Sequence, residues 1–176
     1  MARTSTQIFR ARLRPRVYRD IEIESTKSLY DLAAAIVQAF DFDFDHAFGF
    51  YSKLDEHVFD SPVRYELFAD LEGGGEARSV KRTKVGQAFP AVGSKMQFLF
   101  DYGDDWRFQV ELIGQGEKTP RARYPKVLKA VGKPPPQYPP EDDIEEWGSI
   151  AGAARHRLPC SHVSGQTSRL RGLTGK

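Results

Sequence analysis

The stretch Ile8–Glu24, which reads IFRARLRPRVYRDIEIE, decides how the chain begins to fold. Before Pro15, apolar residues occupy positions 9, 11 and 13, and arginines occupy positions 10, 12 and 14. After Pro15, isoleucines at positions 21 and 23 alternate with acids at positions 20, 22 and 24. Successive side chains of a strand point to opposite faces, so each run has one apolar and one charged face. Because proline favours a turn, the stretch predicts a β-hairpin with one face in the core.

Downstream of this hairpin the apolar period changes from two to three and four, which is typical of a helix. Ser28 and Asp31 have the spacing of a capping box, in which each side chain bonds the backbone of the other residue. Together they predict one principal helix over residues 28–40. One apolar stripe runs along it: Leu29, Leu32, Ala33, Ile36, Val37 and Phe40.

A second alternating region runs from Met96 to Leu112 and turns at Gly103-Asp104-Asp105, which predicts a second antiparallel hairpin. We interpret its aromatic side chains as hydrophobic core, and a ligand pocket lined by these rings is the alternative. The aromatic set consists of Phe48, Phe98, Phe100, Trp106 and Phe108.

These patterns predict a single α+β domain over residues 7–147. It would have an antiparallel-rich mixed sheet, one principal helix and a C-terminal Pro-rich strap that contains Pro134-Pro135-Pro136 and Pro139-Pro140. The order of hairpin, helix, strands and hairpin is β-grasp-like by analogy. Residues 148–176 lack periodicity and are predicted to form a disordered basic tail.

Charge and cysteine content narrow the class of protein. The net charge of +2 is uneven, because residues 151–176 hold five bases and no acid, whereas residues 1–150 hold 21 bases and 24 acids. A whole-chain argument for nucleic-acid binding is therefore invalid. The single cysteine, Cys160, excludes an internal disulfide. With no apolar run of about 18 residues and no signal peptide, we expect a cytoplasmic protein without a membrane segment.

Five segments carry a resemblance to a known family: Pro15–Ile23, Ser28–Leu32, Asp45–Phe50, Phe100–Trp106 and Tyr138–Asp143. The most specific is FDYGDDW at residues 100–106, which is similar to a Tyr-Asp-Phe-Gly-Asp-x-Trp hairpin. The last segment is similar to a closing Pro-Pro-Glu-Asp strap. In this order, over residues 7–147, the segments resemble the plasmid pRiA4b ORF-3-like family.

The resemblance implies a fold and a genomic setting. The family occurs on plasmids, beside transposons and as stand-alone bacterial and archaeal genes, and it implies no established reaction. The chain departs from the family pattern at two positions. Tyr18 stands where a tryptophan is usual, and Tyr138 stands where a cysteine often precedes the strap.

A basic stripe on the first hairpin is the candidate binding surface. Such a stripe could hold the phosphates of single-stranded nucleic acid while an aromatic ring stacks on a base. The alternative is a solvated face whose arginines pair with the acids across the hairpin. The candidate residues are Arg10, Arg12, Arg14, Arg16, Tyr18 and Arg19. A second basic cluster follows the Gly73-Gly74-Gly75 loop: Arg78, Lys81, Arg82 and Lys84.

An acidic set is the candidate metal site. Converging carboxylates and an imidazole would suit Mg²⁺ or Mn²⁺, and such a metal could activate water for phosphodiester cleavage. The alternative is a turn, in which aspartate bonds the nearby backbone. The candidate ligands are His46, Asp101, Asp104, Asp105, Glu141 and Asp142.

Nucleophilic catalysis has no support, because there is no Gly-x-Ser-x-Gly elbow and Cys160 falls in the predicted tail. We therefore expect a non-enzymatic accessory module of mobile DNA that binds nucleic acid or a protein partner. The alternative, from another class, is a metal-dependent phosphodiester hydrolase that uses the acidic set.

Overall fold

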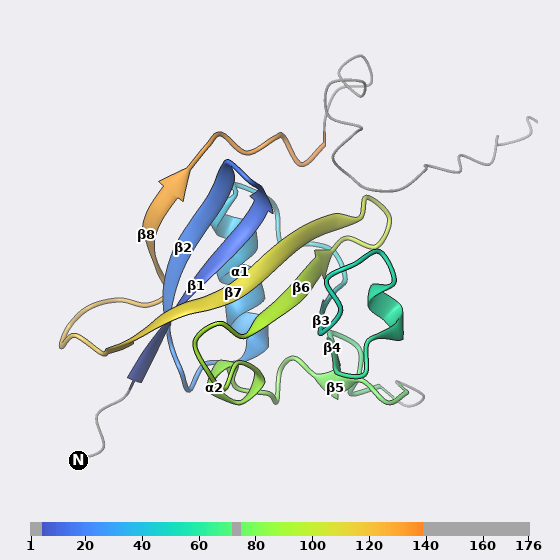
Figure 1. The fold of residues 1–176 in the computed structure, drawn as a ribbon, viewed down its shortest axis with the longest axis horizontal. Coiled ribbons are helices and arrows are strands. Elements are labelled where there is room, and N and C mark those ends of the chain that lie inside the picture. The colour runs from blue at the N-terminus through green and yellow to red at the C-terminus, as the bar shows by residue number, and fades with distance from the viewer. Residues whose placement is uncertain (1–4, 72–74, 139–176) are drawn as a thin grey trace, which may run out of the picture.

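A computed structural model describes residues 5–71 and 75–138, which form one eight-stranded sheet with a helix on one face (Figure 1). The strand order is β5-β4-β3-β6-β7-β1-β2-β8, and every neighbouring pair is antiparallel except β4–β5. The strands are β1 Ser5–Arg14, β2 Val17–Glu24, β3 Phe48–Tyr51, β4 Arg64–Glu66, β5 Arg78–Ser79, β6 Lys95–Phe100, β7 Trp106–Glu117 and β8 Lys126–Val131. The helices are α1 Leu29–Ala39, the 3-10 turn η1 Val58–Asp60 and α2 Val85–Ala88.

The two predicted hairpins are present. In the first, Arg10 lies opposite Asp20 and Arg12 lies opposite Tyr18. The register shifts between Arg12 and Arg14, so strict alternation ends at Arg12. In the second, β6 pairs with β7 around the turn at residues 101–105. The α+β class predicted from the sequence is therefore confirmed.

The principal helix begins where its capping box predicts. The Ser28 hydroxyl accepts a hydrogen bond from the Asp31 amide at 3.1 Å, and the Asp31 carboxylate accepts one from the Ser28 amide at 2.9 Å. These bonds satisfy two backbone donors that a helix start otherwise leaves unpaired. At the other end, Asp41 takes a left-handed φ of 59°, which turns the chain away from the helix axis.

An aromatic core fills the space between α1 and the sheet. Phe40 of the helix end meets Phe108 of β7 edge to face at 4.9 Å, and Phe9 of β1 meets Phe89 in the same way at 4.9 Å. The predicted aromatic set is core, and only Trp106 is partly exposed. Edge-to-face pairs of this kind add to the burial of their apolar area.

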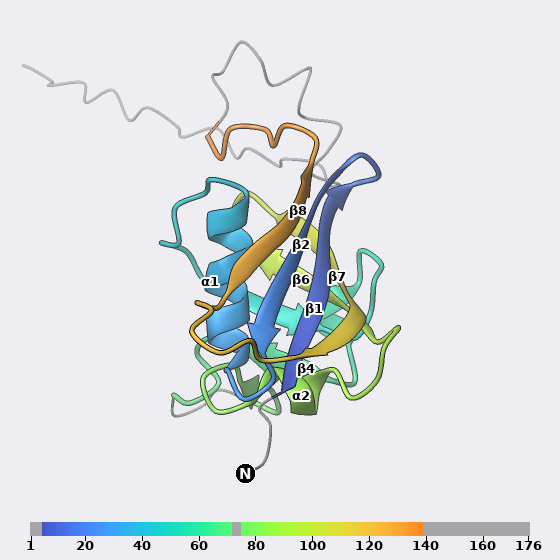
Figure 2. The same cartoon turned by 90° about the vertical axis from the view of Figure 1, so that its left-hand side faces the viewer.

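The two faces of the sheet differ. Figure 2 shows α1 on one face, with the other face of β1, β2 and β7 turned away from it. On that second face the segment around η1 covers only the β3 end, where Val58 packs with Tyr51 and Leu99. The rest of this face, called the open face below, carries polar side chains: Arg12 and Tyr18 are partly exposed, whereas Thr6, Asp20 and Glu22 are buried among their neighbours.

Strand β8 differs from expectation, because no strand was predicted after the second hairpin, which was expected to end at Leu112. It pairs with β2 at the edge of the sheet, and four successive residues, positions 127–130, are exposed. Without one buried face it has no alternating apolar pattern to reveal it. Residues 133–138 follow without helix or strand, and Gln137 accepts a hydrogen bond from the Asp43 amide. The rest of the predicted strap lies outside the described residues.

Candidate nucleic-acid interface

Arg10, the first arginine of the basic stripe, is neutralised by its neighbour across the hairpin. Its Nε and Nη2 donate to the two carboxylate oxygens of Asp20 at 2.8 and 2.9 Å. This bidentate ion pair raises the pKa of the Arg10 guanidinium. The guanidinium also lies 4.5 Å from the centre of the Tyr18 ring. For this residue the interpretation as a cross-strand ion pair holds.

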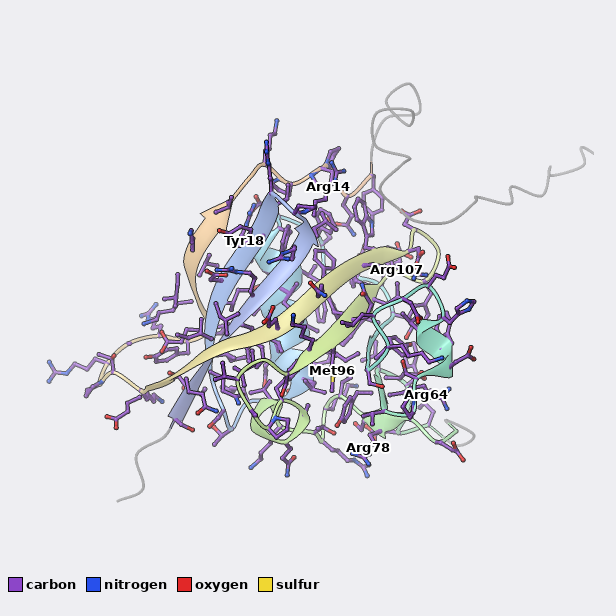
Figure 3. All side chains as sticks on the ribbon, viewed as in Figure 1. Arg14, Tyr18, Arg64, Arg78, Met96 and Arg107 are labelled. Atoms are coloured by element: carbon purple, nitrogen blue, oxygen red, sulfur yellow. The ribbon has the colours of Figure 1, made fainter. Side chains whose placement is uncertain are left out.

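Arg12 and Arg16 differ from Arg10 in their hydrogen bonding and exposure. Arg12 is half-buried on the same strand face, and its Nε has no hydrogen-bond partner among the described residues. A buried donor without a partner is unusual in a folded protein. Arg16 is exposed at the hairpin turn. Arg14, between them, lies at the hairpin end of β1 (Figure 3). It is half-buried, and its burial lowers its pKa.

Arg19, the last residue of the predicted stripe, lies apart from the others. Arg19 is 5% exposed and points toward α1, with its guanidinium 4.7 Å from the centre of the Phe40 ring. Its nitrogens donate to four carbonyl oxygens, those of Tyr18, Ala39, Val131 and Gly132. Arg19 therefore ties β2 to the end of α1 and to the end of β8, which is a structural role.

Tyr18 lies on the open face of the sheet between two cations. Besides Arg10, the ammonium of Lys129 on β8 lies 5.7 Å from the ring centre. Lys129 stands opposite Asp20 in the register. Periodicity did not indicate Lys129, because the edge strand that carries it has no alternating apolar pattern. Tyr18 and Lys129 thus bring the second and eighth strands into one surface with Arg12.

Charge is segregated along the open face. Toward the N-terminal end of β1, each acid meets a base: Glu22 with Lys126 at 2.8 Å, and Glu24 with Lys118 at 2.9 Å. Toward the hairpin turn the bases outnumber the acids among the described residues. Asp20, an acid at this end, is already paired with Arg10. The hairpin end of the open face is therefore the basic end.

The second basic cluster belongs to another part of the molecule. Arg78 is on β5, at the opposite end of the strand order from β2 and β8. Arg82 pairs with Asp70 at 3.0 Å, and Lys81 lies 5.8 Å from the centre of the Tyr30 ring. The two clusters do not form one continuous stripe.

The acidic set forms the turn of the second hairpin. Asp101 is buried, and one of its carboxylate oxygens accepts hydrogen bonds from the amides of Gly103 and Asp104 at 3.0 and 3.3 Å. Asp105 holds the guanidinium of Arg107 at 2.9 and 3.0 Å. Asp101 and Asp105 both have a left-handed φ of 56°. The interpretation as turn chemistry accounts for both carboxylates, and Asp104 is exposed.

The structure brings His46 close to the acidic set. Its Nδ1 is 2.6 Å from an oxygen of Asp45, and its Nε2 is 3.5 Å from an oxygen of Asp101. Chiefly through the bond to Asp45, these carboxylates raise the pKa of His46. Within residues 5–71 and 75–138, no three His, Cys, Asp or Glu side chains are grouped to hold a metal ion. Glu141 and Asp142 lie outside the described residues, so the Mg²⁺ or Mn²⁺ site stays a prediction.

Comparison with solved structures gives a fold relative. The chain is similar to a protein of unknown function, MM3350, from Methanosarcina mazei Go1, with a TM-score of 0.64 and 19% sequence identity. The similarity covers 85% of this chain and 82% of that protein. At this identity the likeness concerns the fold alone. No curated protein matched the chain.

Comparison with protein families gives the wider assignment. The family described as "Plasmid pRiA4b ORF-3-like protein" matches residues 7–148. The matched part includes both hairpins, the principal helix and the turn at residues 101–105. The segments that carried the resemblance in the sequence lie within it. The chain belongs to the plasmid pRiA4b ORF-3-like family.

Proposed function

We propose that the chain is a non-enzymatic binding module that holds single-stranded nucleic acid on the open face of its sheet, at the hairpin end. One observation carries this proposal. Arg12 lies directly opposite Tyr18 on that face, and its Nε has no hydrogen-bond partner in the described part of the chain. A nucleotide needs two groups, and both are present here: a cation without an acidic partner among the described residues, and an aromatic ring beside it.

The division of labour follows from the geometry. Arg12, with Arg16 at the turn, would contact phosphate oxygens, and Lys129 would add charge beside them. Tyr18 would stack on a base. A sheet face with an aromatic ring suits unpaired bases, because a duplex keeps its bases stacked and hidden from such a ring. Arg10 would position Tyr18 and contribute little charge, since Asp20 neutralises it.

The family assignment supports an association with mobile DNA, because its description refers to a plasmid. It supplies no reaction. The hydrolase alternative is less favoured, because one oxygen of Asp101 accepts from the turn amides and Asp105 holds the guanidinium of Arg107. A protein partner is the second candidate for the binding module. Val127 and Leu128 of edge strand β8 are 49% and 48% exposed, which favours that candidate.

The test is fluorescence anisotropy with a labelled single-stranded oligonucleotide and the matching duplex, over a series of salt concentrations. Arg12→Gln and Arg16→Gln should each reduce the salt slope of single-strand binding by about 0.7. Tyr18→Ser should weaken binding by about 1 to 3 kcal/mol, as expected for loss of one stacked base. Arg123→Gln, an exposed arginine on the β7–β8 connection, is the matched control.

The proposal fails if Arg12→Gln and Arg123→Gln bind the single strand equally well. Tighter binding of the duplex would also contradict it, because stacking on Tyr18 would then play no part. If no nucleic acid binds at any salt concentration, the protein-partner candidate takes its place.

The proposal also covers how the whole chain is divided into a domain, a strap and a tail. We infer a domain over residues 7–147 that is β-grasp-like by analogy and is followed by a basic tail. The Pro-rich segment would act as a strap, and the contacts of Gln137 with Asp43 support its first part. No helix in the described ranges has the length and apolar character to cross a membrane. A cytoplasmic location remains a prediction from the sequence.

A further inference from the structure

A cavity of about 270 Å³ lies beside the start of α1, away from the surface that carries Arg12 and Tyr18. It is bounded by the first turn of the helix, by the loop that precedes β3, and by the residues that follow β4 and β5. The volume is slightly below the usual range for ligand sites, about 300 to 1,000 Å³, which limits the site to a small ligand. Neither the family description nor the proposed function gives this cavity a role.

Aromatic rings form much of the cavity wall. Tyr30 and Phe44 meet edge to face at 5.3 Å, and Phe44 packs on Phe48 at 5.1 Å, so this part of the wall is anchored to the core. Phe68 completes the wall and is 56% exposed. An exposed phenylalanine that lines a cavity offers apolar area that a ligand ring can cover.

The charged groups of the cavity are not balanced. Lys81 lies 5.8 Å from the centre of the Tyr30 ring and has no ion-pair partner in the described part of the chain. Asp45, the carboxylate in the wall, is already bonded by His46 at 2.6 Å and by the hydroxyl of Tyr138 at 3.3 Å. The ammonium of Lys81 is therefore the charge left for a ligand.

We propose that this cavity binds a small planar aromatic anion, whose ring lies against Tyr30 and Phe68 and whose phosphate or carboxylate pairs with Lys81. The apolar rings favour a flat ligand, and the ammonium selects its charge. A cationic ligand would meet the ammonium of Lys81 and is disfavoured.

This proposal does not depend on nucleic-acid binding. The cavity is lined from α1, β3 and the segments after β4 and β5, whereas the proposed nucleic-acid surface is on β1, β2 and β8. Variants of one site leave the other intact. Failure of either proposal can therefore be recognised separately.

The test uses anilinonaphthalene sulfonate, an aromatic anion whose fluorescence rises in an apolar site, with the full chain. Lys81→Met keeps the apolar stem and removes the charge, and it should weaken binding about tenfold, as loss of one charge-assisted contact does. Lys27→Met makes the same change at an exposed lysine just before the helix and is the control. Phe68→Ala should also weaken binding, whereas Phe59→Ala, at a phenylalanine that is 53% exposed outside the cavity, should leave it unchanged.

Displacement of the dye identifies the anionic group. Competition by AMP but not by adenosine would assign a phosphate, and competition by indole-3-acetate but not by indole would assign a carboxylate. Either result supports the proposal. It is overturned if the dye fails to bind, if Lys81→Met and Phe68→Ala bind it like the wild type, or if the uncharged compounds compete as well as the anions. Melting curves of each variant check that the fold is retained.

Discussion

The two faces of the sheet are built from the same strands by different means. On the face beneath α1, aromatic and aliphatic side chains exclude water, and Arg19 donates to carbonyl oxygens. On the open face, polar side chains bond one another, as Arg10 does with Asp20, and the Nε of Arg12 has no hydrogen-bond partner among the described residues. The covered face accounts for stability, and the open face leaves room for binding.

The largest difference between the faces should appear when a side chain is removed from each. Phe98 is fully buried between Phe50 and Phe108. Phe98→Ala should lower the free energy of unfolding by about 3 to 5 kcal/mol, because it removes apolar contacts and leaves a cavity. On the open face, Gln109→Ala should change it by less than about 0.5 kcal/mol. Urea unfolding of both variants measures the difference, and equal losses would contradict the division into two faces.

Arginines provide the second contrast. Arg19→Met would leave the carbonyl oxygens of Ala39 and Val131 without their donor. Since an unsatisfied buried acceptor costs about 1 to 3 kcal/mol, we expect a loss of at least about 2 kcal/mol. Arg12→Met should change stability little and act on binding instead. The comparison fails if Arg12→Met unfolds as readily as Arg19→Met.

Sequence periodicity predicts the covered face of the sheet better than its edge and its open face. Periodicity predicts the two hairpins and α1, because each has one buried side. It could also have excluded Arg19, which shares odd parity with Ile21 and Ile23 and so belongs to the covered face. The edge strand β8 could not be predicted, since it has no buried face and therefore no alternating apolar pattern. The cavity could not be predicted either, because Tyr30, Phe68 and Lys81 are far apart in the sequence and come together only in the folded chain.

The sequence alone also leaves pairing undecided on the open face. Alternation places Arg10 and Arg12 on one side of β1, but it does not say which of them faces an acid. Register decides that point: Arg10 lies opposite Asp20, and Arg12 lies opposite Tyr18. Turn chemistry was likewise one of two interpretations for the acidic set until the bonds of Asp101 to the following amides were known.

Two glycines differ in how much space their surroundings leave for a side chain. A Cβ added at Gly49 would lie 2.7 Å from the hydroxyl and 2.9 Å from ring carbons of Tyr51, whose side chain is fully buried. Gly49→Ala should therefore destabilise the protein by about 1 to 3 kcal/mol, the usual cost of overpacking. At Gly114 the added atom would meet Ile8 at an ordinary 3.6 Å, so Gly114→Ala should be close to neutral. Thermal melts distinguish the two, and a harmless Gly49→Ala would show that Tyr51 can move.

The smallest expected effect is at His46, on the rim between the covered face and the turn of the second hairpin. Its pKa is raised in the folded state above the ordinary value of 6.5, chiefly by Asp45. A group with a raised pKa contributes its full stability below the unfolded pKa and loses that contribution as pH rises through the folded pKa. The melting temperature should therefore fall slightly as pH rises from about 6 to 8.

His46→Asn should remove this part of the pH dependence, whereas His57→Asn should not, because His57 is exposed in a loop. The size of the effect is limited by solvent, since the His46 side chain is 37% exposed. If the melting temperature follows the same pH curve in wild type and His46→Asn, the imidazole is not held charged in the folded state.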